Sequence, residues 1–132
     1  MKFARYVFWT AAAWGVLVTL PLFFSEQKMG IDYPPPINHA EYYYSFAAVT
    51  MVWQILFVFI ALNPSKYRSV MIFCALEKMS LLPAFAILFP QGRFPIFWVP
   101  FVIIDLAFGA LFFIAFTKAN NANTVPGSPK KD

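Results

Sequence analysis

The sequence has little charge and almost none of the residues that most often bind metals. Only 12% of its 132 residues are charged, whereas a soluble domain carries about 25%. A single cysteine, Cys74, excludes a disulfide scaffold, and with one histidine the chain shows no metal-ligand spacing. The net charge of +4 is spread over short segments without a long basic face, which argues against nucleic acid as a partner. We therefore expect no metal, cofactor or nucleic-acid site.

Apolar side chains are abundant instead, with 61% hydrophobic residues and 17 phenylalanines. A membrane-spanning helix needs about 20 mainly apolar residues, and four segments meet this requirement: 6–24, 41–62, 70–89 and 94–116. Backbone groups that face lipid must be satisfied within their own segment, so these spans should be helices. The short connections predict an all-α, four-helix transmembrane bundle with up-down-up-down order. Residues 1–118 form this single domain, and 119–132 are predicted to be a disordered cytoplasmic tail.

The flanks of the four spans predict their orientation in the membrane. The first span is interpreted as a retained helix, because its apolar run is longer than a signal core and no small-x-small cleavage site follows. One side of the bundle has only Lys28 and Arg93. Lys and Arg are more numerous on the other side: Lys2, Arg5, Lys66, Arg68, Lys118, Lys130 and Lys131. Because cytoplasmic loops carry the excess of positive charge, both termini are predicted to be cytoplasmic.

Four polar side chains interrupt the spans at similar depth. They are Gln54 in the second span, Glu77 and Lys78 in the third, and Asp105 in the fourth. A charge at the bilayer centre costs about 2.5–3.5 kcal/mol, so such residues normally face the bundle interior and pair with one another. We therefore predict a buried polar cluster in which Lys78 pairs with Asp105. Glu77 then needs a second donor, such as Gln54 or Tyr43, or a proton.

This cluster has two interpretations. Its members either hold the helices together or form a ligand or proton site. Hydrogen bonds between membrane helices average only about 0.6 kcal/mol, which offsets the insertion cost poorly, so we favour a ligand site. Tyr43, Ala47 and Thr50 share a helical stripe with Gln54, and Trp53 is its neighbour. The candidate ligand-binding residues are Gln54, Glu77, Lys78, Asp105, Tyr43 and Trp53.

The opposite end of the bundle carries an outer rim of His39, Glu41 and Arg93. The first two either belong to an interfacial belt or guard a cavity, although residues two apart do not face each other on a regular helix. Asn38 and Glu41 have the spacing of a capping box. Arg93 either anchors at the interface or pairs with Glu41 or a lipid phosphate. The connection 25–40, which contains three consecutive prolines, is predicted to be a stiff connector or a short binding element.

The stretch 41–116 resembles a family of small bacterial four-helix membrane proteins without an assigned function. More distantly it is similar to the DoxX-like proteins, some of which are linked to redox chemistry, and to the EXPERA group, which binds or isomerises sterol-like molecules with buried acids. The resemblance implies a multi-pass protein of the bacterial inner membrane. It rests on the following runs: Glu41-Tyr-Tyr-Tyr-Ser-Phe, Trp53-Gln54, Asn63-Pro-Ser-Lys-Tyr-Arg68, Leu76-Glu77-Lys78, Gly92-Arg93 and Ile104-Asp105-Leu106.

These observations leave several functions open. We favour a non-enzymatic protein that binds a small amphipathic or lipid-like ligand, or an accessory subunit of a membrane complex. The alternatives are an isomerase that uses Glu77 and Asp105 and a subunit of a redox complex. The expected partners are the lipid bilayer and either another membrane protein or a second copy of the chain. A proton-coupled transporter like the small multidrug resistance proteins is least favoured. Those proteins use a glutamate in the first helix, and the first span here has no acid.

Overall fold

The computed structural model describes residues 1–121, and this part of the chain is helical without a strand. Four apolar segments are long enough to cross a membrane: Lys2–Phe24, Ala40–Leu62, Arg68–Leu88 and Ile96–Ala119. The predicted all-α, four-helix bundle is therefore confirmed. Of the predicted tail at 119–132, residues 119–121 belong to the last helix, and the remainder lies outside the described residues.

The spans are built from longer helices and short 3-10 turns. The first span comprises α1 (Lys2–Thr19) and the turn η1 (Leu20–Phe24), and the short helix α2 (Glu26–Asp32) follows. The second span is α3 (Ala40–Leu62). The third comprises η2 (Arg68–Val70), α4 (Met71–Met79) and α5 (Leu82–Leu88), and the fourth comprises η3 (Ile96–Trp98) and α6 (Val99–Asn121).

The third span is interrupted, whereas the sequence predicts one uninterrupted segment over 70–89. Helix α4 ends at Met79 and α5 begins at Leu82. Pro83 has no N–H to donate to the carbonyl of Met79, and its ring crowds that carbonyl. The hydroxyl of Ser80 instead donates to the carbonyl of Glu77 at 2.6 Å. The break therefore lies directly after Glu77 and Lys78, the two charged residues of this span.

The connection between the first two spans is folded against the bundle. Its residues 26–32 form helix α2, which the sequence analysis did not predict. The Tyr44 hydroxyl donates to Glu26 at 2.8 Å, and the Tyr43 hydroxyl donates to the carbonyl of Leu22 at 2.7 Å. Two tyrosines of α3 therefore hold both the end of the first span and the start of α2.

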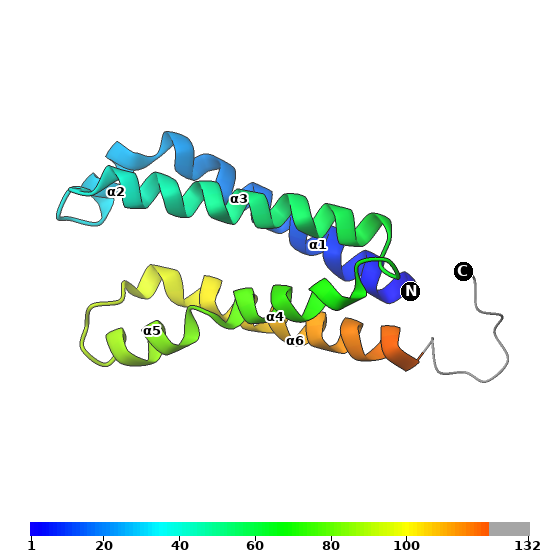
Figure 1. The fold of residues 1–132 in the computed structure, drawn as a ribbon. Coiled ribbons are helices and arrows are strands. Elements are labelled where there is room, and N and C mark those ends of the chain that lie inside the picture. Colours follow the sequence, from blue (N-terminus) through cyan, green and yellow to red (C-terminus); the bar gives the residue numbers. More distant parts are fainter. Residues whose placement is uncertain (122–132) are drawn as a thin grey trace, which may run out of the picture.

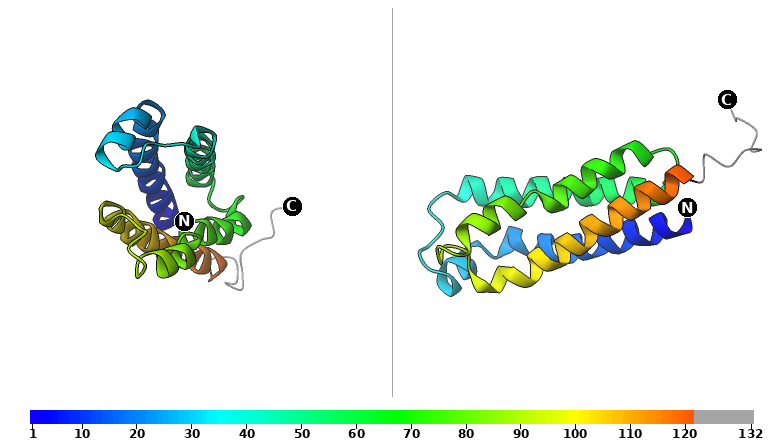
Figure 2. Two further views of the ribbon diagram at one scale, coloured as in Figure 1. Left: turned by 90° about the vertical axis from the view of Figure 1, so that its left-hand side faces the viewer. Right: turned by 90° about the horizontal axis from the view of Figure 1, so that it is seen from below.

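The four spans associate as two pairs. Helix α1 packs along α3, and α4 packs along α6. Contacts between α1 and α6 join the pairs, whereas α3 and α4 touch little. The pairs converge at the end that contains the N-terminus and separate toward α2 and α5 (Figure 1). The view along the bundle shows the same division, with α1 and α3 apart from α4, α5 and α6 (Figure 2, left).

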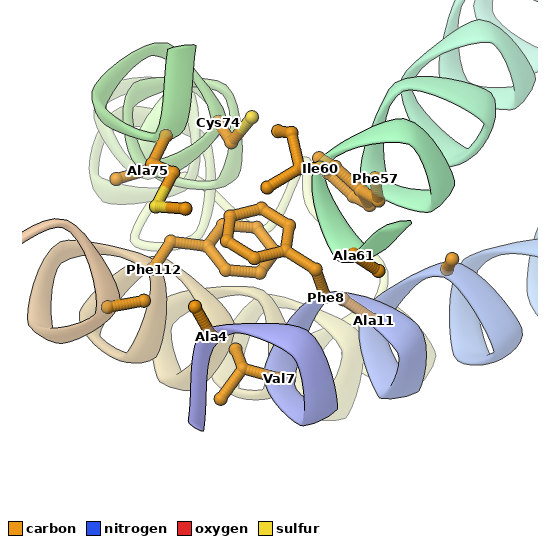
Figure 3. Packing of buried hydrophobic residues seen from close by; sticks show 13 residues of the cluster. Ala4, Val7, Phe8, Ala11, Phe57, Ile60, Ala61, Cys74, Ala75 and Phe112 are labelled. Carbon is orange, nitrogen blue, oxygen red and sulfur yellow. The ribbon is translucent and has the colours of Figure 1, made fainter. Parts of the chain in front are cut away.

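A cluster of aromatic rings fills the space where the pairs converge. Phe8 of α1 stacks on Phe112 of α6 with ring centroids 4.2 Å apart. Phe57 of α3 meets both rings edge-on, at 5.9 and 5.0 Å (Figure 3). All three side chains are fully buried, and alanines of α1 and α6 let the helices approach around them. This aromatic core lies toward one end of the bundle, which leaves room between the pairs farther along.

Candidate functional site

A cavity of about 380 Å³ lies between the two helix pairs. Residues of α1, η1, α3, η3 and α6 line it, together with Lys78 near the end of α4, Leu81 after that helix, and Phe94 and Pro95 before η3. Its walls are mainly apolar and include the aromatic side chains of Trp14, Phe46, Trp98 and Phe101. The volume falls within the usual range for small-molecule pockets, about 300–1,000 Å³. An apolar chamber with a few polar groups is the usual form of a ligand site.

Lys78 supplies the positive charge of this cavity. Its side chain is only 7% exposed, and its Nζ lies 3.1 Å from Asp105 Oδ1 and 3.6 Å from Glu77 Oε2. The predicted pairing of Lys78 with Asp105 is therefore confirmed. The ammonium also lies 5.7 Å from the centre of the Phe57 ring, at the edge of the aromatic core. The ion pair thus joins α4 to α6 at the boundary between core and cavity.

Gln54 supplies a buried carboxamide with one unused acceptor. Its side chain is 1% exposed, and its Nε2 donates to the carbonyl of Thr50 at 2.9 Å. Its Oε1 has no hydrogen-bond partner among residues 1–121. The carboxamide lies against Gly15, where a Cβ atom would overlap it. An unsatisfied buried polar group costs about 1–3 kcal/mol, so this oxygen, which is enclosed beside Gly15, is left at a cost.

The other predicted ligand-binding residues lie outside the cavity lining. Glu77 contacts Lys78, but its Oε2 makes no hydrogen bond. Neither of the donors expected for it is used, because the Gln54 amide bonds to Thr50 and the Tyr43 hydroxyl bonds to a main-chain carbonyl. Trp53 packs on Phe57, with centroids 6.4 Å apart. The structure therefore brings three of the six candidates to the cavity: Gln54, Lys78 and Asp105.

The residues of the predicted outer rim are exposed and do not line the cavity. His39 Nδ1 lies 2.9 Å from Glu41 Oε1, so the expectation that these side chains do not meet is wrong. The contact forms because His39 precedes the regular helix as its N-cap residue. The predicted capping box is also wrong, since no side chain caps α3. Arg93 donates to Gln91 at 3.3 Å, and within residues 1–121 no pairing with Glu41 is present.

The cavity residues of the first span, and those of the fourth span apart from Asp105, were not predicted from the sequence. Trp14 and Phe101 bring α1 and α6 together, with ring centroids 6.3 Å apart, and Trp98 packs against Phe101 at 5.3 Å. Gly15, which gives the Gln54 carboxamide its space, is the one glycine of the first span. That isolated glycine in an alanine-rich helix was the available signal for a close approach.

Comparison of the chain with protein-family models, with curated proteins and with solved structures found no match. The function therefore has to be argued from the cavity. Its polar end holds an ammonium and a carboxylate that neutralise each other, together with the Gln54 carboxamide, whose unpartnered oxygen is enclosed beside Gly15. Such a set is suited to orienting the polar group of a bound molecule whose remaining surface is apolar.

Proposed function

We propose that this chain is a small multi-pass protein of the bacterial inner membrane that binds a neutral amphipathic molecule in the cavity. The observation that carries the proposal is the buried, unpartnered Oε1 of Gln54 at the polar end of an apolar chamber. A small shift of the Gln54 side chain that exposes this oxygen to the cavity would let a hydroxyl or N–H group of a bound molecule donate to it and remove its desolvation cost. The apolar remainder of the molecule would lie between the aromatic walls.

The charges of the lining support a neutral molecule. Lys78 and Asp105 form a pair at 3.1 Å, so neither is left for an oppositely charged ligand. A fatty acid would have to compete with Asp105 for the ammonium, and an amine would have to compete with Lys78 for the carboxylate. A long-chain alcohol or a ring alcohol needs neither exchange. We therefore expect alcohols to bind in preference to acids or amines of the same chain length.

The membrane orientation is part of the same proposal. Seven basic residues flank the spans on one side and two on the other, which supports cytoplasmic termini. Arg68 and Lys118 of the richer side lie over the rings of Phe116 and Phe3, at 4.5 and 4.4 Å. Basic side chains that cover aromatic rings at the ends of spans are typical of a membrane–water interface.

Binding is favoured over the isomerase alternative by the position of the acids. An isomerase of the kind that the EXPERA resemblance suggests would use Glu77 and Asp105 together. Asp105 lines the cavity, whereas Glu77 does not. A proton relay between a bound molecule and Glu77 would have to pass through Lys78, which already contacts both acids. An accessory role in a redox or other membrane complex stays an outcome of the test below.

The test is native mass spectrometry of protein extracted with its surrounding lipid. We compare the wild type with Thr50→Trp, which adds an indole within the lining. The matched control is Val52→Trp, on the same helix but at an exposed position outside the lining. A bound small molecule is expected in the wild type and in Val52→Trp, and its loss is expected in Thr50→Trp.

Three other results would contradict the binding proposal. One is a bare chain in all three samples. Another is a small molecule retained equally by Thr50→Trp, which would place it on the lipid-facing surface. The third is a stoichiometric second polypeptide with no small molecule, which would favour an accessory subunit. A second copy of this chain would be recognised in the same spectrum by its mass.

A further inference from the structure

We propose that molecules enter the cavity sideways from the bilayer, through an opening between α3 and the break that separates α4 from α5. This inference rests on the proposed binding function and narrows the ligand class to molecules dissolved in the hydrocarbon layer. We call this the side opening and define it by Phe46 and Leu81, one on each side.

Packed side chains border the cavity on three sides. At its base the aromatic core and the Lys78 ammonium, 5.7 Å from the Phe57 ring, separate it from the converging ends of the helices. On the side of α1 and α6, the ring contact of Trp14 with Phe101 joins the two helices, and Thr19 is buried. At the end near α2, Tyr33 packs against Phe97 of η3 with centroids 5.2 Å apart.

The fourth wall, between α3 and the third span, is open. Two large lining side chains remain accessible there, with Phe46 59% exposed and Leu81 41% exposed. Helices α3 and α4 touch little, and the two helix pairs separate toward the end of the bundle that contains α2 and α5 (Figure 1). Leu81 lies between the end of α4 at Met79 and the start of α5 at Leu82. Pro95, which precedes η3, is also an exposed residue of the lining.

The side opening lies at a depth where lipid hydrocarbon is expected. Phe46 is six residues beyond the start of α3, which is about 9 Å along the helix at 1.5 Å per residue. Leu81 precedes the end of α5 by seven residues, which gives about 10 Å from the same end of the bundle. A 23-residue helix is about 34 Å long and exceeds the hydrocarbon thickness of about 30 Å only slightly. Both residues therefore face acyl chains.

Cysteine alkylation tests the route directly. In a Cys74→Ala background, which removes the single native thiol, Thr50→Cys places a thiol in the lining. The protein is reconstituted in phosphatidylcholine vesicles and treated with either a long-chain N-alkyl maleimide or a sulfonated, membrane-impermeant maleimide. Entry from the bilayer predicts rapid reaction with the alkyl reagent. The charged reagent should react about a hundredfold more slowly, because its charge is costly to bring into hydrocarbon.

Substitutions at the opening provide the second arm. Leu81→Trp and Phe46→Trp should each slow alkylation of Thr50→Cys by the alkyl reagent several-fold, because an indole is wider than the side chain that it replaces. Leu82→Trp is the matched control, since Leu82 is 40% exposed but does not line the cavity. Alkylation of Val52→Cys, on the lipid-facing surface, should be unaffected by all three substitutions. Thermal unfolding in detergent confirms that each variant is folded.

Equal rates for the two maleimides would overturn the inference, because they would indicate access from water. Rates unchanged by both Leu81→Trp and Phe46→Trp would also overturn it, because they would indicate another route through the lipid-facing surface. Alkylation reports on the route by which a reagent reaches the cavity, and it does not show whether a molecule is bound there. If native mass spectrometry finds no bound molecule while alkylation follows the expected pattern, the binding proposal fails alone.

Discussion

Removing the ammonium of Lys78 should destabilise the protein more than any other single change to its charged residues. Lys78→Met keeps most of the length of the side chain and removes its charge. Asp105 and Glu77 then lose the cation that lies 3.1 and 3.6 Å from them and face each other in a largely apolar setting. Breaking a buried ion pair by deleting one partner costs about 3–5 kcal/mol, chiefly because an uncompensated charge is left behind.

The burial of the three side chains determines where in this range the effect should fall. Lys78 is 7% exposed, Glu77 18% and Asp105 31%. The partial access of Asp105 lets its carboxylate reorient, so we expect about 3 kcal/mol, the lower end of the range. Adding Asp105→Asn and Glu77→Gln to Lys78→Met should restore most of this loss, because the triple variant buries no charge at this position.

The assay is equilibrium unfolding of the detergent-solubilised protein with increasing dodecyl sulfate, followed by circular dichroism. Lys118→Met is the control for the chemical change, since Lys118 is exposed and its ammonium lies over the Phe3 ring; about 0.5–1 kcal/mol is expected. If Lys78→Met costs no more than Lys118→Met, the ion pair does not hold α4 to α6. If the triple variant is no more stable than Lys78→Met, the cost does not come from uncompensated carboxylates.

Three further predictions concern the core, the glycine beside the cavity and the first connection. Phe8→Ala should lower the free energy of unfolding by about 3–5 kcal/mol, and Phe24→Ala, at an exposed position, by far less in the same assay. Gly15→Ala should turn the Gln54 carboxamide away from α1 and reduce the fraction of chains with a bound molecule in native mass spectrometry. An unchanged fraction would show that this carboxamide takes no part in binding. Tyr43→Phe should cost about 0.5–1.5 kcal/mol in dodecyl sulfate unfolding, as expected for one hydrogen bond, and no loss would show that water or lipid replaces it.

The pairing within the polar cluster could be predicted from the sequence for a simple physical reason. A charged side chain within an apolar span is too costly to leave facing lipid, so its partners must lie at the same depth on neighbouring helices. That rule found Lys78 and Asp105 without any knowledge of the fold. It did not find the space beside Gln54, because the close approach of Gly15 depends on which helix packs against α3 and at what height.

Local structure was harder to predict where short-range contacts compete with hydropathy. The apolar run over 70–89 conceals a break, although Pro83 was its visible signal. Helix α2 depends partly on the bond from Tyr44 to Glu26, which lies 18 residues away in the chain and has no local signature. To predict the contact between His39 and Glu41, one must know the residue at which α3 begins, because a shift of one residue changes which side chains meet.

The position of the aromatic core at one end has a consequence for how the molecule fluctuates. Amides near Phe8, Phe57 and Phe112 should exchange their hydrogens slowest, since opening them requires separating all four helices. Helix α5 has no buried residue, so its amides should exchange first. The end of the bundle that holds the aromatic core should therefore be rigid, and the end with α2 and α5 should be flexible. Thermal motion can move the helix pairs apart near α2 and α5 without disturbing the aromatic core.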